Sequence, residues 1–259
     1  MSSTQPQEPH RTALVTGATS GIGLEFARQL AAQGRHLILV ARDRDRLAAV
    51  AQELEGGYAI HTESIVADLL DEDGQAAVQA RIESHVDPVE LLVNNAGYGL
   101  VHSFAENDWE HERDHWRIHT EVPLRLSHAA LVAMRERGGG RIVNVASVAA
   151  FTPRGTYSAA KLAMVNFSKW ATLHHAEHGI VVTALCPGFT RTEFHERMGQ
   201  DTKAFPRLAW LKAEDVVRQG LADSASGKSL SVPSLRYKAA KVAAAVLPAR
   251  TVERLVRRS

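Results

Sequence analysis

The sequence predicts a single α/β domain in which helices cover both faces of a parallel sheet. Short apolar segments alternate along the chain with longer amphipathic ones. This alternation is typical of buried parallel strands that are separated by helices. No internal repeat, low-complexity tract or linker interrupts it. The 259 residues permit one or two domains, and α/β folds of about 200–250 residues often form one. We therefore expect residues 11–259 to form one doubly wound domain.

Six apolar segments are expected to form strands, and the segments between them are expected to form helices. The strands are predicted at residues 12–16, 36–40, 59–66, 91–94, 141–145 and 180–185. The helices are predicted from about 21 to 33, and over about 43–55, 72–85, 107–137 and 157–178. Gly34 and the run Gly138-Gly139-Gly140 are stop signals for the first and the long helix.

The ends of the chain have a different composition. Residues 1–10 are polar with two prolines, lack the apolar segment of a signal peptide and are expected to be a disordered tail. Residues about 190–259 are expected to form a substrate-cleft loop and a C-terminal helical extension, which Pro248 divides. This extension is basic, so contact with an anionic membrane is an alternative to packing over the cleft or at a subunit interface.

Composition excludes several classes of partner. The net charge of +1, from 30 basic and 29 acidic residues, gives no argument for nucleic-acid binding. No apolar run reaches the ~18 residues of a membrane span. The single cysteine, Cys186, excludes an internal disulfide framework and fits a reducing, cytoplasmic environment. Because Cys186 ends an apolar run, we expect a buried structural thiol rather than a nucleophile.

A glycine-rich segment follows the first predicted strand and opens the first predicted helix. Gly17, Gly21 and Gly23 have the spacing G-x-x-x-G-x-G rather than the common G-x-G-x-x-G. Glycines at such a position permit a tight turn and a close approach of a pyrophosphate to the helix N-terminus. A simple turn is the alternative, but the position between strand and helix favours dinucleotide binding.

The end of the second predicted strand indicates which dinucleotide is bound. An acidic residue there hydrogen-bonds the ribose 2′-hydroxyl of NAD, whereas an arginine accommodates the 2′-phosphate of NADP. Arg42 stands at this position and has a donor fork suited to phosphate. NADP(H) is therefore favoured over NAD(H), although Asp43 keeps NAD open. The alternative for Arg42 is a solvated residue at the helix entry.

Tyr157 and Lys161 lie four residues apart on a predicted helix, ten residues after Ser147. Residues at this spacing share one helix face. A lysine cation beside the phenol lowers a pKa that is normally about 10. We therefore expect Tyr157 to exchange protons near neutral pH, as interconversion of a carbonyl and an alcohol requires.

Together, these features resemble the short-chain dehydrogenase/reductase family, in its shorter single-domain branch, over roughly residues 11–195. The residues that match its cofactor-binding motifs are Gly17, Thr19, Ser20, Gly21, Ile22 and Gly23 in the loop, Asp68-Leu69, Asn94-Asn95-Ala96-Gly97, and Pro187, Gly188, Thr190 and Thr192 beside the nicotinamide. Ser147, Tyr157 and Lys161 match its catalytic residues. The resemblance implies a Rossmann-type, three-layer α/β/α fold.

The resemblance also implies roles for these residues. Tyr157 is the general acid in reduction and the base in oxidation. Lys161 binds the nicotinamide ribose and lowers the pKa of Tyr157, while Ser147 hydrogen-bonds the substrate oxygen. A hydroxyl and a phenol at one carbonyl oxygen also stabilise its developing charge.

The sequence departs from the family pattern at three places. His119 occupies the position of an asparagine whose backbone carbonyl holds a water in a proton relay to the lysine. The interval from Ser147 to Tyr157 is about three residues shorter than usual, so Asn144 competes for the serine's aligned position. The C-terminal extension resembles that of reductases with an extra helix rather than that of acyl-carrier-protein reductases.

A zinc-binding pattern, H-E-x-x-H, occurs within residues 111–115, and His119 adds a third histidine one turn later. A zinc hydrolase is therefore a competing hypothesis. The charges of Arg113 and Asp114 favour a solvated helix entry instead, so we expect no metal site. His174, His175 and His178 are likewise expected on or near a helix surface.

The sequence therefore predicts an NADP(H)-dependent oxidoreductase that interconverts a carbonyl and a secondary alcohol on a small apolar substrate. The alternative is an NAD(P)-binding regulatory or scaffold protein with turnover weakened by His119. By the resemblance, the chain is expected to form a homodimer or homotetramer.

Overall fold

The computed structural model describes residues 11–192, 210–247 and 250–251. Seven parallel strands form one sheet in the order β3-β2-β1-β4-β5-β6-β7. The strands are β1 Thr12–Thr16, β2 His36–Ala41, β3 Thr62–Val66, β4 Val89–Asn94, β5 Gly140–Val145, β6 Ile180–Leu185 and β7 Leu230–Ser231. The α-helices are α1 Gly21–Ala32, α2 Arg44–Gly57, α3 Glu72–Glu83, α4 Trp109–His119, α5 Glu121–Arg137, α6 Gly155–His174, α8 Ala213–Ala225 and α9 Leu235–Val246. Two 3-10 turns, η1 Val148–Phe151 and η2 Ala176–His178, complete the described elements.

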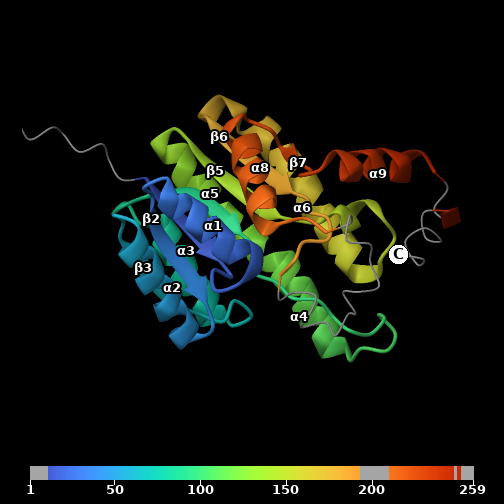
Figure 1. The fold of residues 1–259 in the computed structure, drawn as a ribbon, viewed down its shortest axis with the longest axis horizontal. Helices are drawn as coiled ribbons and strands as arrows, with labels where there is room; N and C mark the ends of the chain where they lie inside the picture. Colours follow the sequence, from blue (N-terminus) through green and yellow to red (C-terminus); the bar gives the residue numbers. More distant parts are fainter. Residues whose placement is uncertain (1–10, 193–209, 248–249, 252–259) are drawn as a thin grey trace, which may run out of the picture.

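The sheet is covered by helices on both faces, which confirms the predicted three-layer, Rossmann-type single domain (Figure 1). Successive strand residues point to opposite faces, so Val15 and Leu14 of β1 belong to different hydrophobic clusters. Val15 packs in the cluster that contains Phe26 of α1, whereas Leu14 packs in the one that contains Leu126 of α5. The near-continuous apolar strands of the sequence follow from this burial on both faces.

Strand order reverses beside β1, which pairs with β2 on one side and with β4 on the other. At such a topological switch point, the loops after the two central strands diverge and leave a crevice at the carboxyl ends of the strands. The loops after β1 and β4 are two of the segments predicted to bind the dinucleotide, and the fold brings them together at this point.

The predicted long helix at 107–137 is wrong, because the segment forms α4 and α5 with Thr120 between them. Thr120 has φ −131° and ψ −67°, which are not helical values. Pro123 explains the break, since proline has no N–H to donate to the carbonyl four residues earlier and is accepted in the first turn of a helix. The carbonyl that loses this donor is that of His119.

Several other boundaries differ from the prediction, most of all at the third strand and at the end of the helix that contains Tyr157. The third strand begins at Thr62, and the helix that contains Tyr157 ends at His174 before the turn η2. Of the three histidines at this end, His174 is exposed, but His175 is buried, contrary to a purely superficial position.

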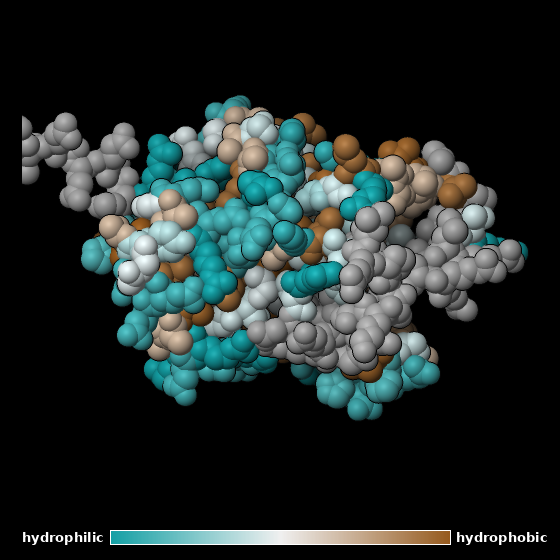
Figure 2. Space-filling model, viewed as in Figure 1, coloured by the Kyte–Doolittle hydropathy of each residue, from teal (hydrophilic) through white to brown (hydrophobic). Residues whose placement is uncertain are grey.

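The C-terminal part adds β7 to the sheet edge, and α9 extends outward from the body (Figure 1). In Figure 2 the surface over α1 and α2 is mainly hydrophilic, whereas hydrophobic residues gather over α9. Residues 1–10, 193–209, 248–249 and 252–259, which include the predicted tail and the break at Pro248, lie outside the described residues. Within the described part, no helix has the length and apolarity that a bilayer crossing requires.

Candidate active site

A cavity of about 1070 Å³ opens at the carboxyl ends of the central strands. The site residues predicted from the sequence that line it are Gly17, Thr19, Ser20, Gly21, Ile22, Arg42, Asp68, Leu69, Asn95, Ala96, Gly97, His119, Ser147, Tyr157, Lys161, Pro187, Gly188, Thr190 and Thr192. Gly23 and Asn94 are the two residues of the predicted cofactor-binding motifs that are not part of this lining. The fold therefore collects at one cavity residues that lie as much as 175 positions apart, from Gly17 to Thr192.

The glycine loop requires glycine for two physical reasons. Gly17 and Gly21 have φ values of +65° and +55°, which residues with a β-carbon rarely adopt. Gly23 has ordinary helical φ, but a β-carbon there would lie 2.1 Å from the Gly17 carbonyl oxygen. Gly23 thus packs the start of α1 against the loop and does not line the cavity.

Hydrogen bonds join the loop after β4 to the end of β1. The Asn95 amide donates to the carbonyl oxygens of Thr16 (2.9 Å) and Gly17 (3.2 Å). In return, the Thr16 hydroxyl accepts from the backbone N–H groups of Asn95 (2.9 Å) and Ala96 (3.0 Å). The two loops at the switch point therefore form one hydrogen-bonded unit.

Asn144 lies in the interior and does not take the place of Ser147. Its carbonyl oxygen accepts from the Asn94 amide (2.9 Å), and its own amide donates to the Ser168 hydroxyl (3.0 Å). Asn144 is buried in β5. These bonds hold β4, β5 and α6 together. Of the two candidates for the serine position, Ser147 lines the large cavity and Asn144 does not.

Arg42 and Asp43, which follow β2 closely, have different environments. Arg42 lines the cavity and lies 3.4 Å from the Asp68 carboxylate, with its side chain 66% exposed. Asp43 is the N-cap of α2 and accepts a hydrogen bond from the Arg46 backbone N–H at 3.0 Å. Because its carboxylate satisfies a helix N-terminus, Asp43 already has a structural role.

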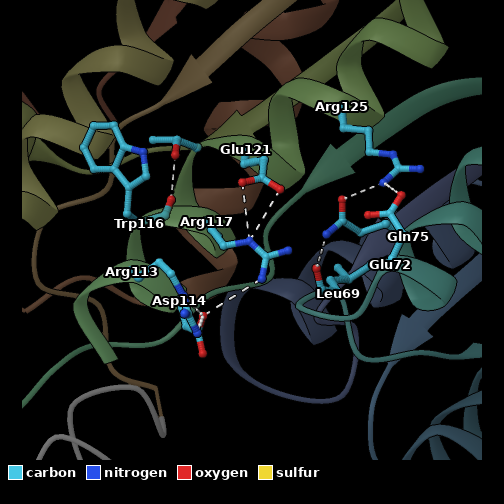
Figure 3. Close-up of polar contacts among 10 residues, drawn as sticks. Leu69, Glu72, Gln75, Arg113, Asp114, Trp116, Arg117, Glu121 and Arg125 are labelled. Carbon is cyan, nitrogen blue, oxygen red and sulfur yellow. Dashed lines mark hydrogen bonds and ion pairs between the residues drawn. The ribbon is translucent and has the colours of Figure 1, made fainter. Parts of the chain in front are cut away.

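The pair Asp68 and Leu69 is held in place from α3 and α5 (Figure 3). The Gln75 amide donates to the Leu69 carbonyl at 3.0 Å, and Gln75 is itself completely buried. Arg125 of α5 donates to the Gln75 carbonyl oxygen at 3.2 Å and also pairs with Glu72. This network fixes the loop after β3 at the edge of the cavity.

Ser147, Tyr157 and Lys161 converge at the opposite end of the cavity. Ser147 caps η1 through the Ala149 backbone N–H (3.1 Å) and hydrogen-bonds Tyr157. Lys161 is buried and donates to the Val145 carbonyl oxygen at 2.8 Å, while its nitrogen lies 5.6 Å from the centroid of the Tyr157 ring. A hydroxyl, a phenol and an ammonium therefore meet beside one strand end.

The pKa of the phenol differs from the expectation. Burial raises the pKa of Tyr157 to about 12, and the hydrogen bond from Ser147 only partly opposes this effect. Burial also lowers the pKa of Lys161 to about 8. The predicted lowering of the Tyr157 pKa is thus wrong for this structure, because loss of hydration outweighs the nearby groups. At neutral pH the phenol keeps its proton and is a donor.

His119 lies behind Tyr157, with its ring centroid 5.4 Å from that of the tyrosine. Its Nε2 hydrogen-bonds the Tyr98 carbonyl at 2.8 Å. Burial, followed by the charge of Lys161, lowers the pKa of His119 well below its usual value, so the imidazole is neutral. A second cavity, of about 10 Å³, lies between His119, Lys161 and Asn94.

The helix entry around the zinc-like pattern was expected to be solvated, but part of it is buried. Glu112 and His115 are buried along with His119, because this face of α4 packs against α6 and the cavity. His111, by contrast, has a side chain that is 70% exposed. The two histidines of the pattern therefore do not converge, and no group of side chains in the described ranges is arranged to hold a metal ion.

Glu112 instead makes two hydrogen bonds that the sequence did not indicate. One carboxylate oxygen accepts from the Asn107 amide at 2.8 Å, and the other accepts from the Thr156 hydroxyl at 2.7 Å. Thr156 immediately precedes Tyr157. The spacing of Glu112, His115 and His119, three and then four residues apart, was the signal of a shared helix face.

Cys186 is completely buried at the end of β6, as predicted. Burial raises the pKa of its thiol to about 12. A thiol that stays protonated at neutral pH is a poor nucleophile, in agreement with a buried structural residue.

Comparison with known proteins decides the family. Residues 11–203 match the family model described as short chain dehydrogenase. The chain belongs to the short-chain dehydrogenase/reductase family. It is 32% identical to the 2,3-dihydro-2,3-dihydroxybenzoate dehydrogenase of Bacillus subtilis over 233 residues, which is 86% of this chain and 85% of that protein.

Solved structures of short-chain dehydrogenases have the same fold. A short-chain dehydrogenase from Sphingobium yanoikuyae in complex with NADPH superposes with a TM-score of 0.83 and 32% identity, covering 90% of this chain and 93% of that one. The bulky-bulky ketone specific alcohol dehydrogenase from Comamonas testosteroni superposes with a TM-score of 0.80 and 28% identity, covering 91% of this chain and 92% of that one. As a short-chain dehydrogenase/reductase, the protein is an NAD(P)-dependent oxidoreductase that acts on alcohol or carbonyl groups.

Proposed function

We propose that the protein is an NADP(H)-dependent carbonyl reductase in which Tyr157 transfers the proton. The observation that carries the proposal is the convergence of Ser147, Tyr157 and Lys161 at one end of the large cavity. When bound, the nicotinamide supplies or accepts the hydride. Ser147 and Tyr157 hydrogen-bond the substrate oxygen, and Lys161 binds the ribose next to the nicotinamide.

In reduction, Tyr157 donates its proton to the oxygen as charge develops there, and Ser147 stabilises that charge. In oxidation, Tyr157 accepts the proton of the alcohol. Since burial raises its pKa to about 12, the protonated form that reduction needs is present across the physiological pH range. A protonated Tyr157 at neutral pH supports a role as the proton donor in reduction.

Proton resupply has a path through the small cavity behind Lys161. A cavity of about 10 Å³ is close to the minimum for one water molecule. Asn94 Oδ1, which is buried and has no hydrogen-bond partner within the described residues, lines this cavity with Lys161. The His119 carbonyl is free of its helical donor because of Pro123. A water here relays protons to Lys161, so turnover survives the replacement of the family's asparagine by His119.

Arg42 and Asp43 support NADP(H) over NAD(H). Arg42 lines the cavity with an exposed guanidinium, which suits a 2′-phosphate. Asp43 is engaged as a helix cap and is not among the residues that line the cavity. The relative from Sphingobium yanoikuyae contains NADPH, in agreement with this preference.

The substrate is a small ketone with an apolar body. Apolar side chains that line the cavity include Val101, Phe104 and Phe189, and the first two are 64% and 54% exposed. The relative from Comamonas testosteroni is a bulky-bulky ketone specific alcohol dehydrogenase, which supports a ketone as the class of substrate. We further propose that the chain functions as a homodimer or homotetramer in the cytoplasm.

Titration with NADPH and NADH, followed by nicotinamide fluorescence, tests this function in wild type, Arg42→Ala and Tyr157→Phe. Wild type is expected to prefer NADPH, and Arg42→Ala to lose that preference. Tyr157→Phe is expected to bind NADPH normally and to reduce no ketone that wild type reduces. Equal NADH binding by wild type would contradict the cofactor assignment. Ketone reduction by Tyr157→Phe at the wild-type rate would contradict the role of the phenol.

A further inference from the structure

Helix α9 contacts a segment of the cavity wall through Tyr237, in its first turn. The ring of Tyr237 lies against Gly188, where a β-carbon would come within 2.1 Å of its Cε2 and Cζ atoms. The hydroxyl of the same side chain accepts a hydrogen bond from the Phe189 backbone N–H at 3.1 Å. One tyrosine therefore contacts two consecutive residues of the segment that follows β6.

This segment, residues 187–192, extends from the catalytic hydroxyls to the glycine loop. At its start, the Pro187 carbonyl accepts from the Val148 backbone N–H at 3.0 Å, directly after Ser147. At its end, Thr192 lies over the glycine loop, since a β-carbon on Gly21 would be 3.1 Å from its Cβ. The segment thus forms one side of the reactive half of the cavity.

A second contact joins α9 to the same region of the cavity wall. Lys241, one turn after Tyr237, lies with its nitrogen 5.4 Å from the centroid of the Phe151 ring. Phe151 ends η1, the turn that begins after Ser147. In contrast, Leu235 and Val242 on the other faces of α9 are 81% and 63% exposed. The face of α9 that meets the body is therefore the face that contacts the cavity wall.

We propose that Tyr237 is a positioning residue, which makes α9 part of the active site. It holds the segment at residues 187–192 in place for the nicotinamide half of the cofactor. The inference rests on the proposed function. The contact of the ring with Gly188 and the hydrogen bond to Phe189 keep the segment in its bound arrangement before the cofactor arrives. Without them, part of the binding free energy is spent on ordering the segment.

The binding test compares two ligands on the full chain. NADPH would contact both the part of the site that contains Arg42 and the part beside residues 187–192. Adenosine 2′,5′-bisphosphate contains no nicotinamide, so its affinity reports only on the part that contains Arg42. Tyr237→Ala removes the ring and the hydroxyl, Tyr237→Phe removes the hydroxyl alone, and Leu235→Ala is the control on the exposed face of α9.

We expect Tyr237→Ala to weaken NADPH binding by about tenfold and Tyr237→Phe by about threefold, as the loss of one hydrogen bond predicts. Both Tyr237 variants should bind the bisphosphate with an affinity within about twofold of wild type. Leu235→Ala should bind both ligands within the same range. Unchanged NADPH affinity in Tyr237→Ala would overturn the inference. A parallel loss of bisphosphate affinity would also overturn it, because Tyr237 would then act on the whole fold.

Hydrogen exchange gives a readout that needs no ligand. The Phe189 amide should exchange about tenfold faster in Tyr237→Phe than in wild type, since its acceptor is lost. An unchanged exchange rate would contradict the contact itself. If wild type binds the bisphosphate but not NADPH, the proposed function fails, while this measurement still reports whether Tyr237 holds the segment.

Discussion

A β-carbon on Gly97 would lie 2.3 Å from Cε1 and 2.8 Å from Nδ1 of His119. The His119 imidazole therefore packs directly on the backbone after β4. Its Nε2 continues this contact by bonding the Tyr98 carbonyl. His119 thus joins the end of α4 to the loop at the switch point.

This contact predicts that Gly97 and His119 are energetically coupled. Gly97→Ala should lower the free energy of unfolding by about 1–3 kcal/mol, because the buried imidazole has no room to move. His119→Ala opens that space, so the double variant should be more stable than the sum of the single losses predicts. Urea unfolding of the four proteins measures the coupling. Strictly additive losses would show that the two residues do not meet.

Glu112 is predicted to hold the start of α6 beside Tyr157. Glu112→Ala removes the acceptor of both Asn107 and Thr156, and we expect a loss of about 2–4 kcal/mol in unfolding free energy. Glu112→Gln keeps one acceptor oxygen for Asn107 and should lose less than half as much. The urea midpoints of the two variants test this order. If Glu112→Gln is as unstable as Glu112→Ala, the loss of unfolding free energy comes from the missing charge and not from the missing hydrogen bonds.

Asp43 is predicted to act on stability and not on cofactor choice. Asp43→Ala should cost about 1 kcal/mol of unfolding free energy, because the N-terminus of α2 loses its cap. Asp43→Ser restores a capping oxygen and should recover most of this loss. The ratio of NADPH to NADH affinity should stay at the wild-type value in both. A tenfold shift of that ratio in Asp43→Ser would contradict this interpretation.

Lys161 is predicted to make stability depend on pH in the alkaline range. Its pKa is lowered from 10.5 in the unfolded chain to about 8 in the fold. Between these values the unfolded state binds more protons, so the stability of wild type rises with pH there. Lys161→Met should therefore be more stable than wild type at pH 7, by about 1–3 kcal/mol.

This advantage of Lys161→Met should shrink as the pH rises from 8 to 10.5 and vanish above 10.5, where the lysine becomes neutral in the unfolded state as well as in the fold. Urea unfolding at pH 7, 8.5 and 10 measures it. A stability difference that is constant with pH would show that the ammonium does not carry the penalty.

Sequence reasoning located the central strands well, because burial on both faces gives β1, β4 and β6 nearly continuous apolar runs. It was less accurate for β3, which lies at the sheet edge and exposes Glu63 and Val66. An edge strand has only one neighbour and a weaker apolar pattern. Its predicted start was three residues too early for this reason.

The α4 face was misread because its buried residues are polar. An apolar stripe marks a core-facing helix, but Glu112, His115 and His119 are buried by hydrogen bonds and ring contacts that depend on distant segments. Pro123 was a local signal of the helix break and was available in the sequence. The contact of Tyr237 with Gly188 had no such signal, since 49 residues separate them.

The burial of Cys186 has a practical consequence for labelling. It is the one cysteine in the sequence, and its thiol is sealed at the end of β6 with a pKa of about 12. A cysteine introduced at an exposed position will therefore react selectively with a maleimide dye, and no native residue has to be removed first. Leu235→Cys, on the outer face of α9, would turn the wild-type background into a fluorescent reporter of that helix as cofactor binds.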